Sequence, residues 1–156
     1  MNPKECGNMN ISKDISEKIE KYGWSPERKI DTTEIIKALK EEGYHISEYA
    51  LKVIEQFGNL ELEQPAFRVK NETEKIHLNP LRASTRIYRD RVSEYEERTD
   101  ESLVVIGEAY NGHLTLMVSS SGKVYGGYDN YLNRLGNSFE EALESIYYSK
   151  EAEEIN

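Results

Sequence analysis

The sequence has one cysteine and no long apolar run. Because Cys6 is the single cysteine among 156 residues, the chain cannot form an internal disulfide, and a lone thiol is typical of a reducing compartment. No apolar stretch approaches the roughly 18 to 20 residues that a membrane-spanning helix needs. The opening residues 1–10 are polar, unlike the apolar core of a signal peptide. We therefore expect a soluble, cytoplasmic protein in which Cys6 has no functional role.

Basic residues are outnumbered by acidic ones. The chain carries 20 Lys and Arg against 29 Asp and Glu, which gives a net charge of −9. An acidic surplus repels the phosphates of nucleic acids and attracts cationic surfaces. The charge therefore disfavours direct binding to nucleic acid and favours a protein partner with a basic surface, although acidity also serves solubility.

Motifs for metal, phosphate and nucleophile chemistry are missing. The histidines His45, His77 and His113 lie 32 and 36 residues apart, and no Cys-x-x-Cys or His-Glu-x-x-His spacing occurs. We expect them to be ordinary histidines on solvent-exposed faces or turns. The glycines form no phosphate-binding loop, and no Gly-x-Ser-x-Gly or Cys–His signature is present. The sequence thus predicts no metal site, no cofactor and no enzymatic activity.

One catalytic alternative stays open, a hydrolase that uses Glu108, Asp129 and His113. Paired carboxylates can serve as acid and base, but 29 acidic residues make accidental pairs common. A buried Glu108 held by backbone amides or tyrosine hydroxyls would be structural instead. The hydrolase requires a cleft that brings the three side chains together.

The first third of the chain has the pattern of helices. Apolar residues recur at three- and four-residue steps among charged ones, and glycines follow the last turns. The spacing of Asp31 and Glu34 predicts a reciprocal N-terminal cap for the second helix, and Ser47 opens the third. The predicted helices cover residues 12–21, 31–43 and 47–58.

Alternating apolar and polar residues then predict strands with one solvent-exposed face. A segment without alternation, residues 103–106, predicts a strand covered on both faces. A helical stripe returns between Leu81 and Arg98, where Asn79-Pro80 either begins the helix or forms a separate turn. The apolar face of this stripe consists of Leu81, Thr85, Tyr88, Val92 and Tyr95. Ser138 and Glu141 have the spacing of a capping box for a final helix. The predicted strands cover residues 60–63, 67–70, 75–78, 103–106, 113–118 and 123–128.

Strands that are grouped rather than alternating with helices indicate an α+β fold. We expect a single domain in which helices pack around a mostly antiparallel sheet of about six strands. Residues 1–21 are predicted as an N-terminal extension, residues 22–149 as the domain proper, and residues 150–156 as a frayed acidic tail. Gly126 and Gly127 indicate a bulge, the commoner meaning, or the close approach of another backbone.

Six ordered pieces of sequence carry a family resemblance. They are Gly-Trp-Ser-Pro at 23–26, Arg-Lys-Ile-Asp at 28–31, Phe-Gly at 57–58, Asn-Pro-Leu-Arg-Ala at 79–83, Gly-Glu-Ala-Tyr-Asn-Gly-His at 107–113 and Gly-Lys-Val-Tyr-Gly-Gly-Tyr-Asp at 122–129. From about Tyr22 to Tyr147 the chain resembles the third branch of the SUKH superfamily of bacterial immunity proteins. The resemblance implies an α+β protein that binds and neutralises a polymorphic toxin, typically a nuclease or nucleic-acid deaminase domain. It supplies no catalytic residues.

An inhibitor surface combines rigid aromatic anchors with carboxylates that face Lys and Arg. Tyrosine supplies eleven of the aromatic residues, against three Phe and one Trp. The residues that we predict to contact the toxin are a tyrosine-rich group and the carboxylates of the last helix: Tyr110, Tyr125, Tyr128, Asp129, Tyr131, Glu140, Glu141 and Glu144. Glu61 and Glu63 form a third candidate edge. A scaffold or regulatory module that binds another kind of partner is the alternative, and nothing indicates the oligomeric state.

Overall fold

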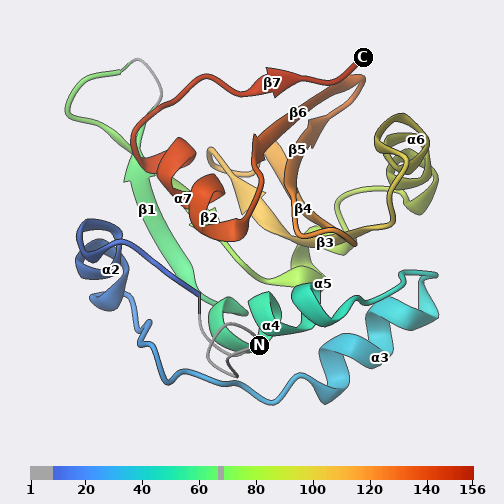
Figure 1. Cartoon of the computed structure of the whole chain (residues 1–156), viewed down its shortest axis with the longest axis horizontal. Coiled ribbons are helices and arrows are strands. Elements are labelled where there is room, and N and C mark those ends of the chain that lie inside the picture. The colour runs from blue at the N-terminus through green and yellow to red at the C-terminus, as the bar shows by residue number, and fades with distance from the viewer. Residues whose placement is uncertain (1–8, 67–68) are drawn as a thin grey trace.

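The computed structural model of the chain describes residues 9–66 and 69–156 (Figure 1). Cys6 and residues 67–68 of the strand predicted at 67–70 lie outside the described residues. The prediction is wrong for residues 69–70, which lie in a loop. Within these ranges the chain forms six helices and seven strands. The strands make one sheet in which they lie in the order of the sequence, and every neighbouring pair is antiparallel. The structure confirms the predicted α+β class.

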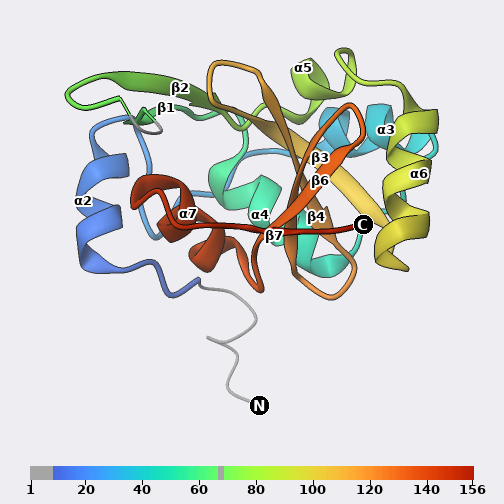
Figure 2. The same ribbon diagram turned by 90° about the horizontal axis from the view of Figure 1, so that it is seen from above.

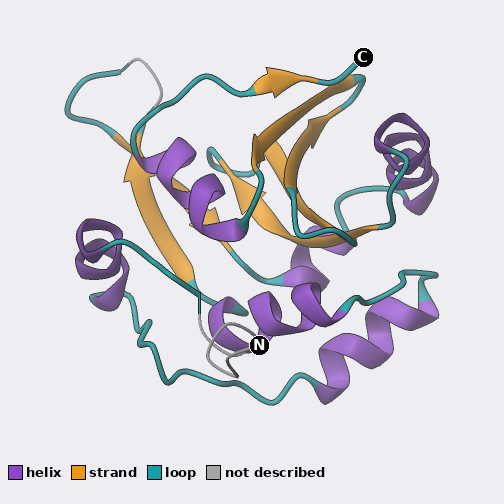
Figure 3. Ribbon diagram, in the orientation of Figure 1, coloured by secondary structure: helices purple, strands orange, loops and turns teal. Residues whose placement is uncertain are grey.

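Helices surround this sheet (Figure 3). The helices are α2 (Lys13–Glu20), α3 (Thr33–Glu41), α4 (Glu48–Phe57), α5 (Pro80–Ser84), α6 (Arg89–Thr99) and α7 (Phe139–Tyr147). The strands are β1 (Glu61–Pro65), β2 (Thr73–His77), β3 (Leu103–Ala109), β4 (Leu114–Ser119), β5 (Val124–Tyr128), β6 (Tyr131–Gly136) and β7 (Glu153–Glu154). Helices α2 and α6 lie on opposite sides of the molecule in both views (Figures 1 and 2). Among the described helices, none has the length and apolarity to cross a membrane.

Polar side chains set where the N-terminal helices begin. The hydroxyl of Ser47 accepts a hydrogen bond from the third backbone N–H that follows, at 3.1 Å, and so caps α4 as predicted. The reciprocal cap predicted between Asp31 and Glu34 is wrong, because Thr32 is the N-cap of α3 and makes no side-chain cap bond. Asp31 instead accepts hydrogen bonds from the backbone and hydroxyl of Thr33, so it stabilises the turn before the helix.

The single helix predicted between Leu81 and Arg98 is two helices. The side chain of Asn79 accepts a hydrogen bond from the backbone N–H of Arg82 at 3.0 Å and so caps α5. Helix α5 ends after five residues, and α6 begins at residue 89. Tyr88, which the helical stripe placed on the buried face, is 86% exposed. Periodicity failed here because a short break between two helices leaves the spacing of the apolar residues almost unchanged.

The sheet extends beyond the predicted strands at its C-terminal edge. Strand β3 is buried along its whole length, which confirms a strand covered on both faces. The sequence pattern predicted neither β6 nor β7, and the tail that was expected to fray pairs with β6 as β7. The backbone N–H of Ile155 donates to Leu132 O at 2.7 Å, and Arg134 forms an ion pair with Glu153 at 2.7 Å. Pairing with a distant strand therefore orders the tail.

Gly126 and Gly127 lie inside a regular strand rather than at a bulge. The register of β5 against β4 runs unbroken through both residues, and the irregularity in β5 lies between Val124 and Tyr125. A Cβ on Gly127 would lie 2.6 Å from Cε2 of Tyr95, and Gly126 is equally crowded. Both predicted meanings are therefore wrong, because the atoms that crowd the two glycines belong to side chains and not to another backbone.

The core joins the N-terminal helices to the C-terminal one. Ile15 and Ile19 of α2 are buried, as is the aromatic group of Trp24, Phe57 and Phe139. The rings of Trp24 and Phe57 stack with their centroids 5.8 Å apart, and those of Phe57 and Phe139 are 4.6 Å apart. Helix α7 packs on β6, β1 and α2. The domain boundaries at residues 21 and 149 stay predictions.

Candidate functional site

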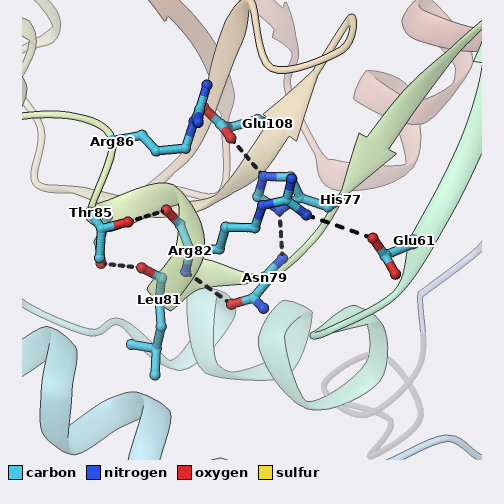
Figure 4. Close-up of polar contacts among 9 residues, drawn as sticks. Glu61, His77, Asn79, Leu81, Arg82, Thr85, Arg86 and Glu108 are labelled. Atoms are coloured by element: carbon cyan, nitrogen blue, oxygen red, sulfur yellow. Dashed lines mark hydrogen bonds and ion pairs between the residues drawn. The ribbon is translucent and has the colours of Figure 1, made fainter.

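A buried polar cluster lies between β2 and β3. Nε2 of His77 is 2.7 Å from Oε1 of Glu108, and Nε of Arg86 donates to Oε2 of Glu108 at 2.9 Å. His77 and Glu108 are only 7% and 3% exposed, whereas about half of the Arg86 side chain faces solvent. Figure 4 shows the three side chains converging from β2, β3 and the loop after α5. Each carboxylate oxygen of Glu108 therefore has its own partner.

The hydrogen bonds of His77 identify its tautomer. Nδ1 accepts a hydrogen bond from the backbone N–H of Asn79 at 3.3 Å, so the proton of the neutral ring lies on Nε2 and is donated to Glu108. Both ring nitrogens are thus engaged within the chain. The prediction that His77 lies on a solvent-exposed face or turn is wrong, because the alternation of β2 stops at its end, where Ile76 and His77 are both buried.

This cluster joins two parts of the sheet. His77 and Glu108 form the one backbone pair between β2 and β3 in the described sheet. A Cβ on Gly107 would lie 2.1 Å from the carbonyl oxygen of His77, so the two strands meet where only glycine fits. The backbone N–H of Lys75 donates to Oδ1 of Asn111 at 2.7 Å and strengthens the same junction. The cluster is therefore a structural connection between the β1–β2 hairpin and the rest of the sheet.

The three residues of the hydrolase alternative line one cleft of about 560 Å³. We call it the α6 cleft, because α6 and the loop before it form one wall. Glu108, His113 and Asp129 all border it, which meets the first requirement of that alternative. No hydrogen bond or ion pair in the described residues joins any two of them: Glu108 is held by the buried cluster, and Nδ1 of His113 lies 2.7 Å from the carbonyl oxygen of Tyr110. The geometry gives no support to acid–base catalysis.

Metal chemistry finds no support either. Among residues 9–66 and 69–156, no three His, Cys, Asp or Glu side chains form a group that could hold a metal ion. His77 has no nitrogen left for a ligand bond, because Glu108 and Asn79 occupy both. The polar groups at the junction of β2 and β3 hydrogen-bond to one another.

Three of the predicted partner-binding tyrosines lie together. Tyr110, Tyr128 and Tyr131 line a second cleft of about 570 Å³ together with Leu114 and Leu135, and we call it the tyrosine cleft. Tyr128 and Tyr131 are 55% and 39% exposed. The turn between them carries Asp129 in the left-handed conformation, with φ at 49°. The β5–β6 turn therefore brings Tyr128 and Tyr131 together with one of the predicted carboxylates, and Tyr110 joins them from the turn after β3.

Tyr125 does not join this group. It is buried, and its hydroxyl donates to Oε2 of Glu101 at 3.2 Å. Burial, together with the Glu101 carboxylate, raises the pKa of Tyr125 to about 12. Tyr125 and Tyr128 are an odd number of residues apart on β5, so the pleat sends their side chains to opposite faces of the sheet. The side chain of Tyr125 packs within the fold and is not available to a partner.

The predicted carboxylates of α7 lie away from the tyrosine cleft. Strand β6 separates the β5–β6 turn from the first turn of α7, and its six residues span about 20 Å. Oε1 of Glu141 accepts a hydrogen bond from the backbone N–H of Asn137, and Glu140 accepts one from a tyrosine of α4. Glu144 lies 3.7 Å from Lys150, which borders the tyrosine cleft. Glu140 and Glu141 thus form a separate acidic surface.

The third candidate edge borders another cleft, of about 680 Å³, beside β1 and β2. Glu61 lies 3.6 Å from Nη1 of Arg82, and Glu63 accepts a hydrogen bond from the hydroxyl of Tyr22 at 3.1 Å. Figure 4 shows Arg82 reaching toward Glu61. Both carboxylates therefore have partners within the chain.

Sequence reasoning missed three residues here. His77 and Arg86 belong to the buried cluster, and Tyr88 borders the α6 cleft. No spacing rule links His77, Arg86 and Glu108, because the sheet brings them together. Tyr88 carried a signal that was misinterpreted, since it fitted the helical stripe that the structure interrupts.

A sheet of seven antiparallel strands covered by helices defines an α+β domain, and a tyrosine-lined cleft lies at one of its turns. The chain belongs to the SUKH-3 immunity protein family, whose model matches residues 11–149 of the 156. The match confirms the resemblance carried by the six sequence motifs. It gives the chain the role of an immunity protein, which implies a cognate toxin as partner. Searches of curated proteins and of solved structures found no match.

Proposed function

We propose that this protein neutralises its cognate toxin by binding it through the surface around the β5–β6 turn and covering the toxin's active site. The observation that carries the proposal is the gathering of Tyr110, Tyr128 and Tyr131 around one cleft, with Asp129 beside them. Aromatic side chains near the centre of an interface supply much of the binding energy in protein complexes. Exposed tyrosines on a paired hairpin lose little conformational freedom when they bind.

The charge of the protein supports a particular class of toxin. A nuclease or a nucleic-acid deaminase domain presents a basic surface to phosphates, and a protein with a net charge of −9 is attracted to such a surface. Electrostatic attraction of this kind accelerates association at low salt. We expect a Kd between nanomolar and picomolar, about −12 to −16 kcal/mol of binding free energy. Occupying the toxin's active site requires no turnover by this chain.

Co-expression tests the proposal. The toxin domain encoded beside this chain should arrest growth when expressed alone, and growth should recover when the two are expressed together. The two proteins should also co-purify. If the neighbouring toxin does not bind this protein, and its growth arrest persists on co-expression, the proposal is contradicted. That result would favour a scaffold role with another partner.

Charge reversal at the β5–β6 turn tests the proposed surface. Asp129→Lys should slow association with the toxin at low salt, because it places a cation where the toxin's basic surface approaches. Glu17→Lys is the matched control, since it changes the net charge equally but lies on α2, on the far side of the molecule from α6. Stopped-flow association rates that fall equally for both variants would show that only net charge matters.

A further inference from the structure

Tyr88 occupies a position that the fold does not explain. It is the N-cap of α6, yet its side chain makes no cap hydrogen bond, and Ser, Thr, Asp or Asn stabilise such a position better. Its side chain is 86% exposed, more than that of any other exposed large apolar or aromatic residue in the described chain. A residue that breaks a local rule without a structural gain points to function.

The backbone that carries Tyr88 is nevertheless fixed on both sides. Before it, Arg86 is tied to the buried carboxylate of Glu108 at 2.9 Å, and the backbone N–H of Arg86 donates to Ala83 O at 3.0 Å. After it, the N–H of Arg91 donates to the carbonyl oxygen of Tyr88 at 3.0 Å. The phenol is therefore presented to solvent from an ordered backbone, which lowers the entropic cost of using it in an interface.

Tyr88 and Tyr128 both border the α6 cleft. Helix α6 holds the β5–β6 turn in place. The hydroxyl of Tyr95 donates to Asp129 O at 2.6 Å, and Nη1 of Arg98 donates to Asn130 O at 2.9 Å. The loop that carries Tyr88 and the turn that carries Tyr128 are thus connected through one helix, so the cleft is formed before any partner arrives.

The charges around this cleft leave one carboxylate uncompensated. Arg86 is paired with Glu108, and Arg91 is paired with Glu94 at 2.6 Å. The carboxylate of Asp129 is exposed and forms no ion pair with any described residue. A site with aromatic rings and one unpaired carboxylate fits a cation, because ring faces and carboxylates both attract ammonium and guanidinium groups.

We propose that Tyr88 contacts the cognate toxin, and that the α6 cleft between Tyr88 and Tyr128 receives a lysine or arginine side chain of the toxin with Asp129 as its counter-charge. This inference rests on the proposed function. It extends the toxin-binding surface from the β5–β6 turn to the loop between α5 and α6. Tyr128 borders both this cleft and the tyrosine cleft, so the two form one continuous surface.

Two matched tyrosine variants test the contact. Tyr88→Ala should weaken binding to the purified toxin domain encoded beside this chain at least tenfold, with an unchanged denaturation midpoint. Tyr148→Ala removes another exposed tyrosine, beside Asp14 of α2, and should change the Kd less than twofold. Equal binding by wild type and Tyr88→Ala would overturn the inference and leave the proposed function standing. A wild-type protein that binds no toxin would overturn both.

The charge of the occupant is tested at Asp129. Asp129→Asn keeps the shape of the side chain and removes its charge, so it should weaken binding several-fold at low salt and less at high salt. If Tyr88→Ala weakens binding while Asp129→Asn leaves it unchanged at both salt concentrations, the cleft accepts an uncharged side chain, and the cationic occupant is overturned.

Discussion

Glu108 and Asp129 border the same cleft, yet the fold uses the two carboxylates differently. Glu108 is buried, and both of its oxygens have partners, in His77 and Arg86. Asp129 lies on an exposed turn and forms no ion pair among the described residues. A buried carboxylate with a complete set of partners maintains a fold, whereas an exposed and unpaired one can meet a partner. The difference lies in burial and partners rather than in residue type.

The largest effect is expected when the buried carboxylate is removed. Glu108→Ala leaves the Nε2 proton of His77 buried without an acceptor, so it should lower the free energy of unfolding by about 3 kcal/mol, the lower end of the range for breaking a buried ion pair, because Arg86 is half exposed. Glu61→Ala is the control. It breaks the exposed pair with Arg82 and should cost at most about 0.5 kcal/mol. Equal urea midpoints for the two variants would contradict the structural role of the cluster.

A smaller effect is expected where α6 meets the sheet. Gly127→Ala places a Cβ 2.6 Å from Cε2 of Tyr95, whose hydroxyl is held by the β5–β6 turn. Overpacking should destabilise the protein by about 1–3 kcal/mol, which exceeds the ~0.4–1 kcal/mol that alanine gains by restricting the unfolded chain. Thermal unfolding measures whether Gly127→Ala is less or more stable than the wild type. A stabilised variant would show that the Tyr95 ring can move aside.

The smallest effect concerns Glu101 and depends on pH. Burial alone would raise the pKa of this carboxyl, but hydrogen bonds from Ser121 and Ser119 and the charge of Lys123 hold it below its ordinary value of 4.5. A lowered folded-state pKa stabilises the fold above the unfolded value, and this contribution is lost as the pH falls through the folded value. The free energy of unfolding of the wild type should therefore exceed that of Glu101→Gln by about 1 kcal/mol at pH 7. This difference should shrink as the pH falls below 4.5. A difference that is constant with pH would contradict the assignment.

Much of the fold could be predicted because local patterns determine it. The Ser47 cap, the two-sided burial of β3 and the capping hydroxyl of Ser138 follow from neighbouring residues alone. The break between α5 and α6 and the pairing of β7 could not be predicted in this way. The first leaves the helical period intact, and the second depends on a strand about twenty residues earlier in the chain.

The candidate site was predictable only in part. The tyrosines of the β5–β6 turn are close in sequence, so Tyr128, Asp129 and Tyr131 could be grouped by inspection. Tyr125 was included wrongly among exposed anchors, because strand parity, which sends it to the opposite face from Tyr128, was not applied. The pairing of His77 with Glu108 joins residues 31 positions apart, and only the sheet register reveals it.

We propose that the exposed tyrosines of the β5–β6 turn act in binding the toxin rather than in folding. The most direct measurement is the affinity of the double variant Tyr128→Ala, Tyr131→Ala for the toxin domain encoded beside this chain, together with its unfolding curve. We expect binding weakened at least a hundredfold. The free energy of unfolding should fall by only about 1 kcal/mol, because both rings are exposed and the one hydrogen bond lost is that from Nδ2 of Asn133 to the Tyr131 hydroxyl, at 3.1 Å. A double variant that binds the toxin as tightly as the wild type would contradict this proposal.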